Sequence, residues 1–231
     1  MISAIARCDV HAENIKLSWW EGQKISKIHI QTPTLNFYSD EILINDSLIK
    51  VLIQKGTINE IILHQPDALL RVSKDENQRI ASPFKSLEIK NGNFQLQTIQ
   101  KNYKFLSLNS KLNLTKDAQF VSTGTISCGL EKGDFSCDVK FNDNSIQLVS
   151  FEANFLPVDL LQIIIKNNYF SSISSLFGEK LKGSLLFDRQ KKIFNFDILT
   201  DKTKIKYDGK PNSTIKINIE NINGTASLAV R

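Results

Sequence analysis

The chain has 231 residues, of which 41% are hydrophobic and 23% are charged, and its net charge is +5. This balance excludes a disordered tail, a collagen-like fibre and a multi-pass membrane protein. The basic residues are mostly lysines scattered singly, without the arginine forks and interleaved aromatics of nucleic-acid-binding proteins, so we expect no nucleic-acid partner.

Alternating apolar and polar residues predict β-strands along most of the chain. Short turns of the Asn-Gly, Lys-Gly and Asn-Asp type separate the strands and favour antiparallel meanders. One such turn is expected at Asn91-Gly92, inside the segment Ile89–Leu96. The predicted fold is mainly β: a long curled antiparallel sheet, forming an open β-groove or partial barrel.

Two segments have helical spacing instead. A short helix is expected near residues 47–55, because Leu48, Val51 and Leu52 recur at helical intervals between the N-cap Ser47 and Gly56. A longer helix is expected near residues 157–177, starting at Pro157 and ending at Gly178.

Two of the three cysteines lie in a predicted hairpin. With Lys132-Gly133 as its two-residue turn, the hairpin places Cys128 opposite Cys137. At a non-hydrogen-bonded position this pair is close enough for a disulfide, and it is equally consistent with two small thiols on a buried face. The sequence leaves both alternatives open.

Residue patterns that carry chemistry are missing. The histidines, His11, His29 and His64, have no metal-binding spacing, and no nucleophile or phosphate-binding motif occurs. We therefore expect no enzyme, no metal and no cofactor. The first ten residues do not read as a signal peptide, and no apolar run reaches the length that crosses a bilayer as a helix.

Residues 8–72 follow a distinctive order. A strand ends in Leu17-Ser-Trp-Trp20, and a turn with Gly22, further strands, a short helix ending at Gly56 and a strand after Pro66 follow. In this order the segment resembles the N-terminal region of the AsmA-like family, which is related to TamB and to repeating β-groove lipid-transfer proteins. The segments 89–96 and 178–183 resemble the same family more weakly.

The resemblance implies a module on the periplasmic side of the bacterial inner membrane. It implies a membrane anchor before this chain, phospholipid as the ligand, envelope proteins as partners, and a role in lipid transport or outer-membrane biogenesis. The organisation expected is one elongated domain over residues 1–231. It would comprise an AsmA-like unit at 8–72, a β-meander at 73–155, and a helix with a second meander at 156–231.

A one-faced apolar sheet could hold acyl chains without any catalytic residue. The candidate lining residues are apolar strand positions: Leu106, Leu108, Leu112, Leu114, Ile126, Phe135, Val139 and Phe141. The same residues would fit the closed core of a structural or adhesive surface β protein, either a sandwich or a solenoid. The sequence does not separate a groove from a closed core.

Overall fold

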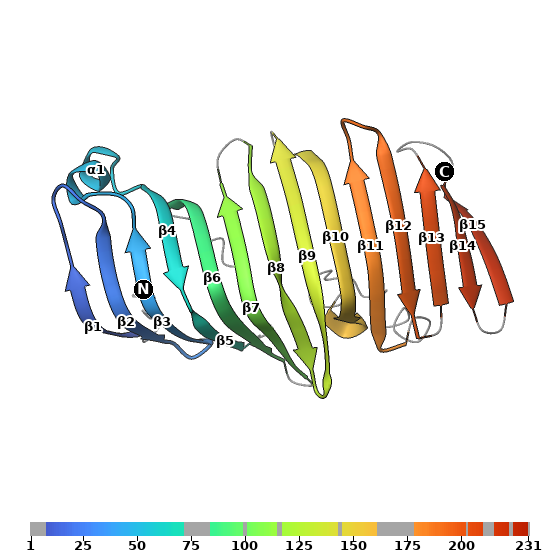
Figure 1. Cartoon of the computed structure of the whole chain (residues 1–231), viewed down its shortest axis with the longest axis horizontal. Helices are drawn as coiled ribbons and strands as arrows, with labels where there is room; N and C mark the ends of the chain where they lie inside the picture. The colour runs from blue at the N-terminus through green and yellow to red at the C-terminus, as the bar shows by residue number, and fades with distance from the viewer. Residues whose placement is uncertain are drawn as a thin grey trace, which may run out of the picture. The chain divides into compact units, whose positions relative to one another are not determined.

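A computed structural model describes residues 8–71, 84–98, 101–114, 117–142, 145–160, 178–201, 203–209, 215–221 and 224–230. The chain divides into two compact units, residues 1–129 and 130–231, and each is described by itself. Figure 1 shows that strands make up nearly all of both units.

The first unit is a single sheet. Its strands lie in the order β1, β2, β3, β4, β6, β7, β8, and β5 pairs with both β3 and β6. Their bounds are β1 (Asp9–Lys16), β2 (Gln23–Gln31), β3 (Leu35–Ile44), β4 (Ile58–His64), β5 (Asp67–Arg71), β6 (Phe84–Gln97), β7 (Asn102–Asn113) and β8 (Gln119–Cys128). Among the strands described, β1 pairs with β2 alone, so this sheet ends in an open edge.

The second unit is an antiparallel meander in which successive strands are hydrogen-bonded neighbours. Its strands are β9 (Glu131–Asn142), β10 (Ser145–Pro157), β11 (Lys180–Asp188), β12 (Ile193–Thr200), β13 (Thr203–Gly209), β14 (Ile215–Asn221) and β15 (Gly224–Val230). Strand β15 pairs with β14 alone among the described strands and forms the second open edge.

The predicted mainly β, curled-sheet fold is confirmed, but the sheet is not entirely antiparallel. Strand β6 runs parallel to both β4 and β5. The return from β5 to β6 passes through residues 72–83, which is long enough for the crossover that a parallel pair requires. A local turn cannot make such a connection, and the short-turn pattern of the sequence therefore predicted antiparallel pairs throughout.

The short helix is confirmed as α1 (Leu48–Ile53), with the Ser47 side chain accepting a hydrogen bond from the Lys50 backbone. Gly56 follows with a φ of 83°, a left-handed conformation that favours glycine. The longer helix starts later than expected, because β10 continues through Pro157. Residues 158–160 are helical, and the rest of the expected helix lies outside the described residues.

Two predicted turns are wrong. Asn91-Gly92 lies inside the continuous strand β6, where Asn91 has a φ of 53° and forms a bulge. Lys132-Gly133 lies inside β9, and the turn after β8 is made by Gly129 and Leu130 instead. The Cys128–Cys137 register expected for a disulfide is therefore lost, and both cysteines are free thiols.

A line of left-handed residues, which we call the bulge line because it contains two bulges, crosses the first sheet at one level. Lys27, Gln65, Asn91 and Ser107 all have a φ near 50°. The first three fall between the same two cross-strand rows, His29–Tyr38–Asp67–Asn93 and Ser26–Glu41–His64–Lys90. Ser107 falls at the register shifts of β7 against β6 and β8. At Lys27 and Gln65 the register with the neighbouring strands is unbroken, whereas Asn91 and Ser107 lie at register shifts and form bulges. A bulge bends its strand and shifts the alternation of its side chains by one residue.

Among the residues whose side chains the structure describes, few apolar ones are fully buried for the number of strands. In the first unit they are Ile28, Leu96, Tyr103 and Ile126. In the second they are Ala153 and the cluster that closes the end of β10, namely Phe155, Leu156, Val158 and Leu160. Most other apolar strand residues are half-buried. Both sheets therefore keep much of their apolar surface within reach of solvent.

Candidate lipid-binding face

One apolar row crosses the whole first sheet. The strand register places seven residues opposite one another in succession, one from each of seven strands: Val10, Ile30, Phe37, Ala68, Phe94, Phe105 and Ile126. The rings of Phe94 and Phe105 have their centroids 5.8 Å apart, within the range of favourable aromatic pairs. Directly opposed side chains of this kind are the unit of sheet stabilisation.

Three more rows accompany the first. Their members are Leu35–Leu70–Leu96–Tyr103, Ile15–Ile25–Ile42–Leu63–Ile89–Ser110–Ser122 and Gln23–Ile44–Ile61–Leu87–Leu112–Phe120. Rows on both sides of the bulge line end in β8, at Phe120, Ser122 and Ile126. Because β8 has no left-handed residue and alternates regularly, these three residues share one face. We call the four rows together the apolar face.

A break in the alternation at the left-handed residues of β2 and β7 keeps the apolar face continuous. In β7, Phe105 and Leu108 are half-buried, whereas Leu106 and Ser107 between them are exposed. In β2 the same spacing of three residues separates Ile25 from Ile28. Without this break in the alternation, a strict period of two would turn one half of each strand toward the opposite side.

The second unit has an apolar face of its own. Its rows are Phe135–Ala153–Gly183–Ile198, Cys137–Phe151–Leu185–Phe196 and Val139–Val149–Phe187–Phe194. The Phe194 ring meets those of Phe187 and Phe196 edge-on, with centroid separations of 6.2 Å and 5.5 Å. Burial raises the pKa of the Cys137 thiol, and the neighbouring Asp138 charge adds to this effect.

Gly183 is required where it stands in the first of these rows. Its φ is 149°, and a Cβ atom at this position would lie 2.0 Å from the backbone oxygen of Asp197 on the neighbouring strand β12. Only glycine allows β11 and β12 to approach this closely.

Of the eight predicted lining residues, Leu108, Leu112 and Ile126 lie on the apolar face of the first unit. Phe135, Val139 and Phe141 share the apolar side of β9 in the second unit. Leu106 is wrongly placed by the sequence: it pairs with Thr125 on the opposite side, because the bulge at Ser107 shifts the alternation of β7. Leu114 lies one residue beyond the end of β7 and is 42% exposed.

Sequence reasoning missed the aromatic members of the apolar face, Phe37, Phe94 and Phe105. A signal for them exists in the sequence. Apolar residues in β6 and β7 change from odd to even numbers in mid-strand, and the change coincides with Asn91 and Ser107. Asparagine is the non-glycine residue that tolerates the left-handed conformation best, so it marks a bulge as well as a turn.

The opposite side of the first sheet is polar. A hollow of about 550 Å³ there is lined by residues such as His11, His29, Asn36 and Asp67. Lys27 forms an ion pair of 2.8 Å with Glu13, and the hydrogen bond and charge of that carboxylate raise the pKa of Lys27. The described residues contain no group of three side chains that could hold a metal ion.

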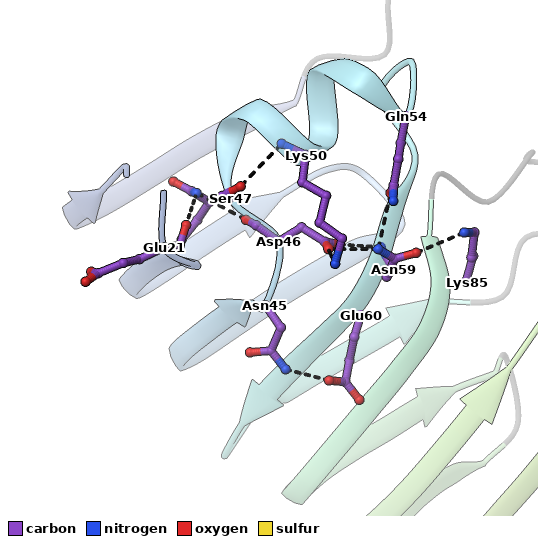
Figure 2. A network of polar contacts seen from close by, with 10 residues as sticks. Glu21, Asn45, Asp46, Ser47, Lys50, Gln54, Asn59, Glu60 and Lys85 are labelled. Carbon is purple, nitrogen blue, oxygen red and sulfur yellow. Dashed lines mark hydrogen bonds and ion pairs between the residues drawn. The ribbon is translucent and has the colours of Figure 1, made fainter. Parts of the chain in front are cut away.

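A polar network fastens α1 to the start of β4 (Figure 2). The Asp46 side chain is 1% exposed and accepts hydrogen bonds from Asn59 N at 2.5 Å, Asn59 Nδ2 at 2.8 Å and Lys50 Nζ at 2.7 Å. Burial by itself would raise the pKa of this carboxyl, but the hydrogen bonds outweigh burial and hold its pKa below the usual value. Lys85 Nζ extends the network to the start of β6 by donating to Asn59 Oδ1.

Comparison of the chain with protein-family models, with curated proteins and with solved structures finds no match. In the described part of the chain, no helix combines the length and the apolar character needed to cross a membrane. The candidate site therefore stands on its own geometry: two apolar sheet faces with half-buried side chains.

Proposed function

We propose that this protein is a non-enzymatic lipid-binding module that holds phospholipid acyl chains along its apolar sheet faces. The observation that carries the proposal is the continuity of the apolar face of the first unit. Two of its four rows of cross-strand neighbours run from the open edge β1 to β8, and most side chains of the four rows are only half-buried.

Physical chemistry supports an acyl chain as the occupant. Each methylene group removed from water contributes about 0.8 kcal/mol, so a bound chain would offset the exposure of the face. An acyl chain needs no hydrogen-bond partner, and polar members of the face already have partners. The Oγ atoms of Ser110 and Ser122 are hydrogen-bonded to each other at 2.7 Å, and the Gln23 side chain donates to Ser18 O and Asp46 O. The phosphate headgroup would remain in water.

The resemblance of residues 8–72 to the AsmA-like family supports the same proposal and adds a cellular location to it. It suggests the periplasmic side of a bacterial inner membrane, and transport of phospholipid within the cell envelope. Binding and transfer of phospholipid are the whole of the proposed activity.

The test is lipid extraction from the natively purified protein, followed by mass spectrometry and by uptake of a fluorescent phospholipid. Co-purified phospholipid and saturable uptake are the expected results. A protein that carries no lipid and takes up none would refute the proposal and favour a structural or adhesive β protein.

A further inference from the structure

Large exposed apolar side chains gather at one corner of the first unit. In the described chain, seven of the fourteen large hydrophobic residues that are exposed lie in β1, in the turn that follows it and in α1. They are Val10, Ile15, Leu17, Trp19, Trp20, Leu52 and Ile53. Trp20 is 83% exposed and Ile53 76%. We call Leu17, Trp19, Trp20, Leu52 and Ile53 the apolar tip.

The two segments of the apolar tip are held together. Leu48 N, at the start of α1, donates to Ser18 O in the turn over 3.1 Å. The buried Gln23 side chain donates to Ser18 O at 2.9 Å and to Asp46 O at 3.1 Å, just before the helix. Figure 1 shows α1 beside the turn between β1 and β2. These hydrogen bonds fix the turn and the start of α1 relative to each other.

We propose that the apolar tip docks this protein onto the surface of an anionic lipid bilayer. Tryptophan suits the boundary between headgroups and acyl chains, because its ring is apolar and its N–H still finds polar partners. Leucine and isoleucine beside it can enter the acyl region. A large apolar surface on a protein exposed to water marks an interaction site.

Charge around the tip points to the same occupant. Residues 15–24 and 46–56 contain four lysines (Lys16, Lys24, Lys50 and Lys55) and two acids (Glu21 and Asp46). Lys24 forms an ion pair with Glu41 of β3, and with this partner counted the net charge is +1. The Asp46 carboxylate is buried and paired with Lys50. Lys55 is exposed, and its side chain has no ion-pair partner among the described residues. Lysine near an anionic leaflet is attracted to it.

The tip is also continuous with the apolar face. Val10 and Ile15 on the edge strand β1 begin two rows of that face, and β1 leads directly into the tip. This inference rests on the proposed function in one respect: docking at this corner would bring a bilayer to the open edge of a lipid-binding face. A flat protein partner would gain nothing from that continuity.

The experiment uses the only two tryptophans of the chain, both in the tip, as reporters. The protein is mixed with large vesicles of phosphatidylethanolamine and phosphatidylglycerol, and with vesicles of phosphatidylcholine alone. We expect sedimentation with the anionic vesicles, a blue shift of tryptophan emission and quenching by brominated acyl chains. The neutral vesicles should bind more weakly.

The test variant is Leu52→Ser with Ile53→Ser, which keeps both reporters. We expect its affinity for the anionic vesicles to fall at least about tenfold. The matched control is Leu130→Ser with Ile146→Ser, which also removes two exposed apolar side chains but leaves the tip intact, and it should bind like the parent. Circular dichroism confirms that both variants fold.

Unshifted emission in the presence of vesicles, or equal binding by the test variant and the parent, would overturn the docking proposal. So would a blue shift without vesicles that grows with protein concentration, since it would assign the tip to a second copy of the chain. Lipid extracted from the purified protein without vesicle binding would refute docking alone. Vesicle binding without extractable lipid would refute the proposed lipid-binding function alone.

Discussion

Leu106 and Leu112 lie on the same strand, and a strict period of two would place both on the same face. The bulge at Ser107 places them on opposite sides instead. Leu112 is opposite Leu87 and Phe120 on the apolar face, and Leu106 is opposite Thr125 on the polar side. Replacing each by aspartate therefore tests the bulge and the lipid-binding face together.

For Leu112→Asp we expect a loss of about 2–3 kcal/mol in the free energy of unfolding. Burying a leucine completely contributes about 1.5–3 kcal/mol, and half of that is lost at a half-buried position. Placing a carboxylate among apolar neighbours, without a partner, adds a further cost of about 1–2 kcal/mol. For Leu106→Asp we expect a loss of about 1 kcal/mol or less, because the residue is already 36% exposed.

Urea unfolding followed by circular dichroism measures the stability of both variants, and mass spectrometry of extracted lipid measures their load. We expect Leu112→Asp to carry several times less lipid than Leu106→Asp. Equal losses in the two variants would show that the alternation of β7 is not shifted. Complete unfolding of Leu112→Asp would indicate a closed core, and unchanged lipid load in both would remove this face as the binding site.

Five further predictions concern Asp46, Gly183, Asn91 and the cysteines. Asp46→Ala should lower stability by about 2–4 kcal/mol, since it leaves a buried N–H unpaired and removes an ion pair. Because folding lowers the pKa of Asp46, its contribution is present above the unfolded value of about 3.9 and is lost as the pH falls through the folded pKa, which a urea series at pH 3 to 7 measures. Gly183→Ala should cost at least about 3 kcal/mol, because the added Cβ meets the neighbouring backbone, and unchanged thermal unfolding would contradict this. Asn91→Val should destabilise by about 2 kcal/mol while Asn91→Gly stays within about 1 kcal/mol of the parent, as judged by urea midpoints. Exposed Cys8 should react with a thiol reagent at pH 7 faster than Cys137, whose raised pKa leaves little thiolate until the pH is well above neutral, and mass spectrometry without reduction should find no disulfide.

The pattern of half-buried strands was readable because it is local. Period-two alternation needs no knowledge of distant contacts. Ser47 and Gly56 likewise marked the start and the end of the short helix. The errors arose where one local signal has two structural meanings. Asn91-Gly92 is a favoured turn sequence, and the same tolerance of left-handed backbone makes it a bulge inside β6.

The sequence by itself determined that this protein is mainly β, that one side of its strands is apolar and that a short helix follows β3. Which strands pair, and in which direction, was decided only by the tertiary structure, since β6 returns alongside β4 and β5 through contacts far apart in the chain. The bulge line is a property of several strands together. It places Leu106 on the polar side and Phe105 on the apolar face. The direction of each side chain depends on the register with the neighbouring strands as well as on its own position.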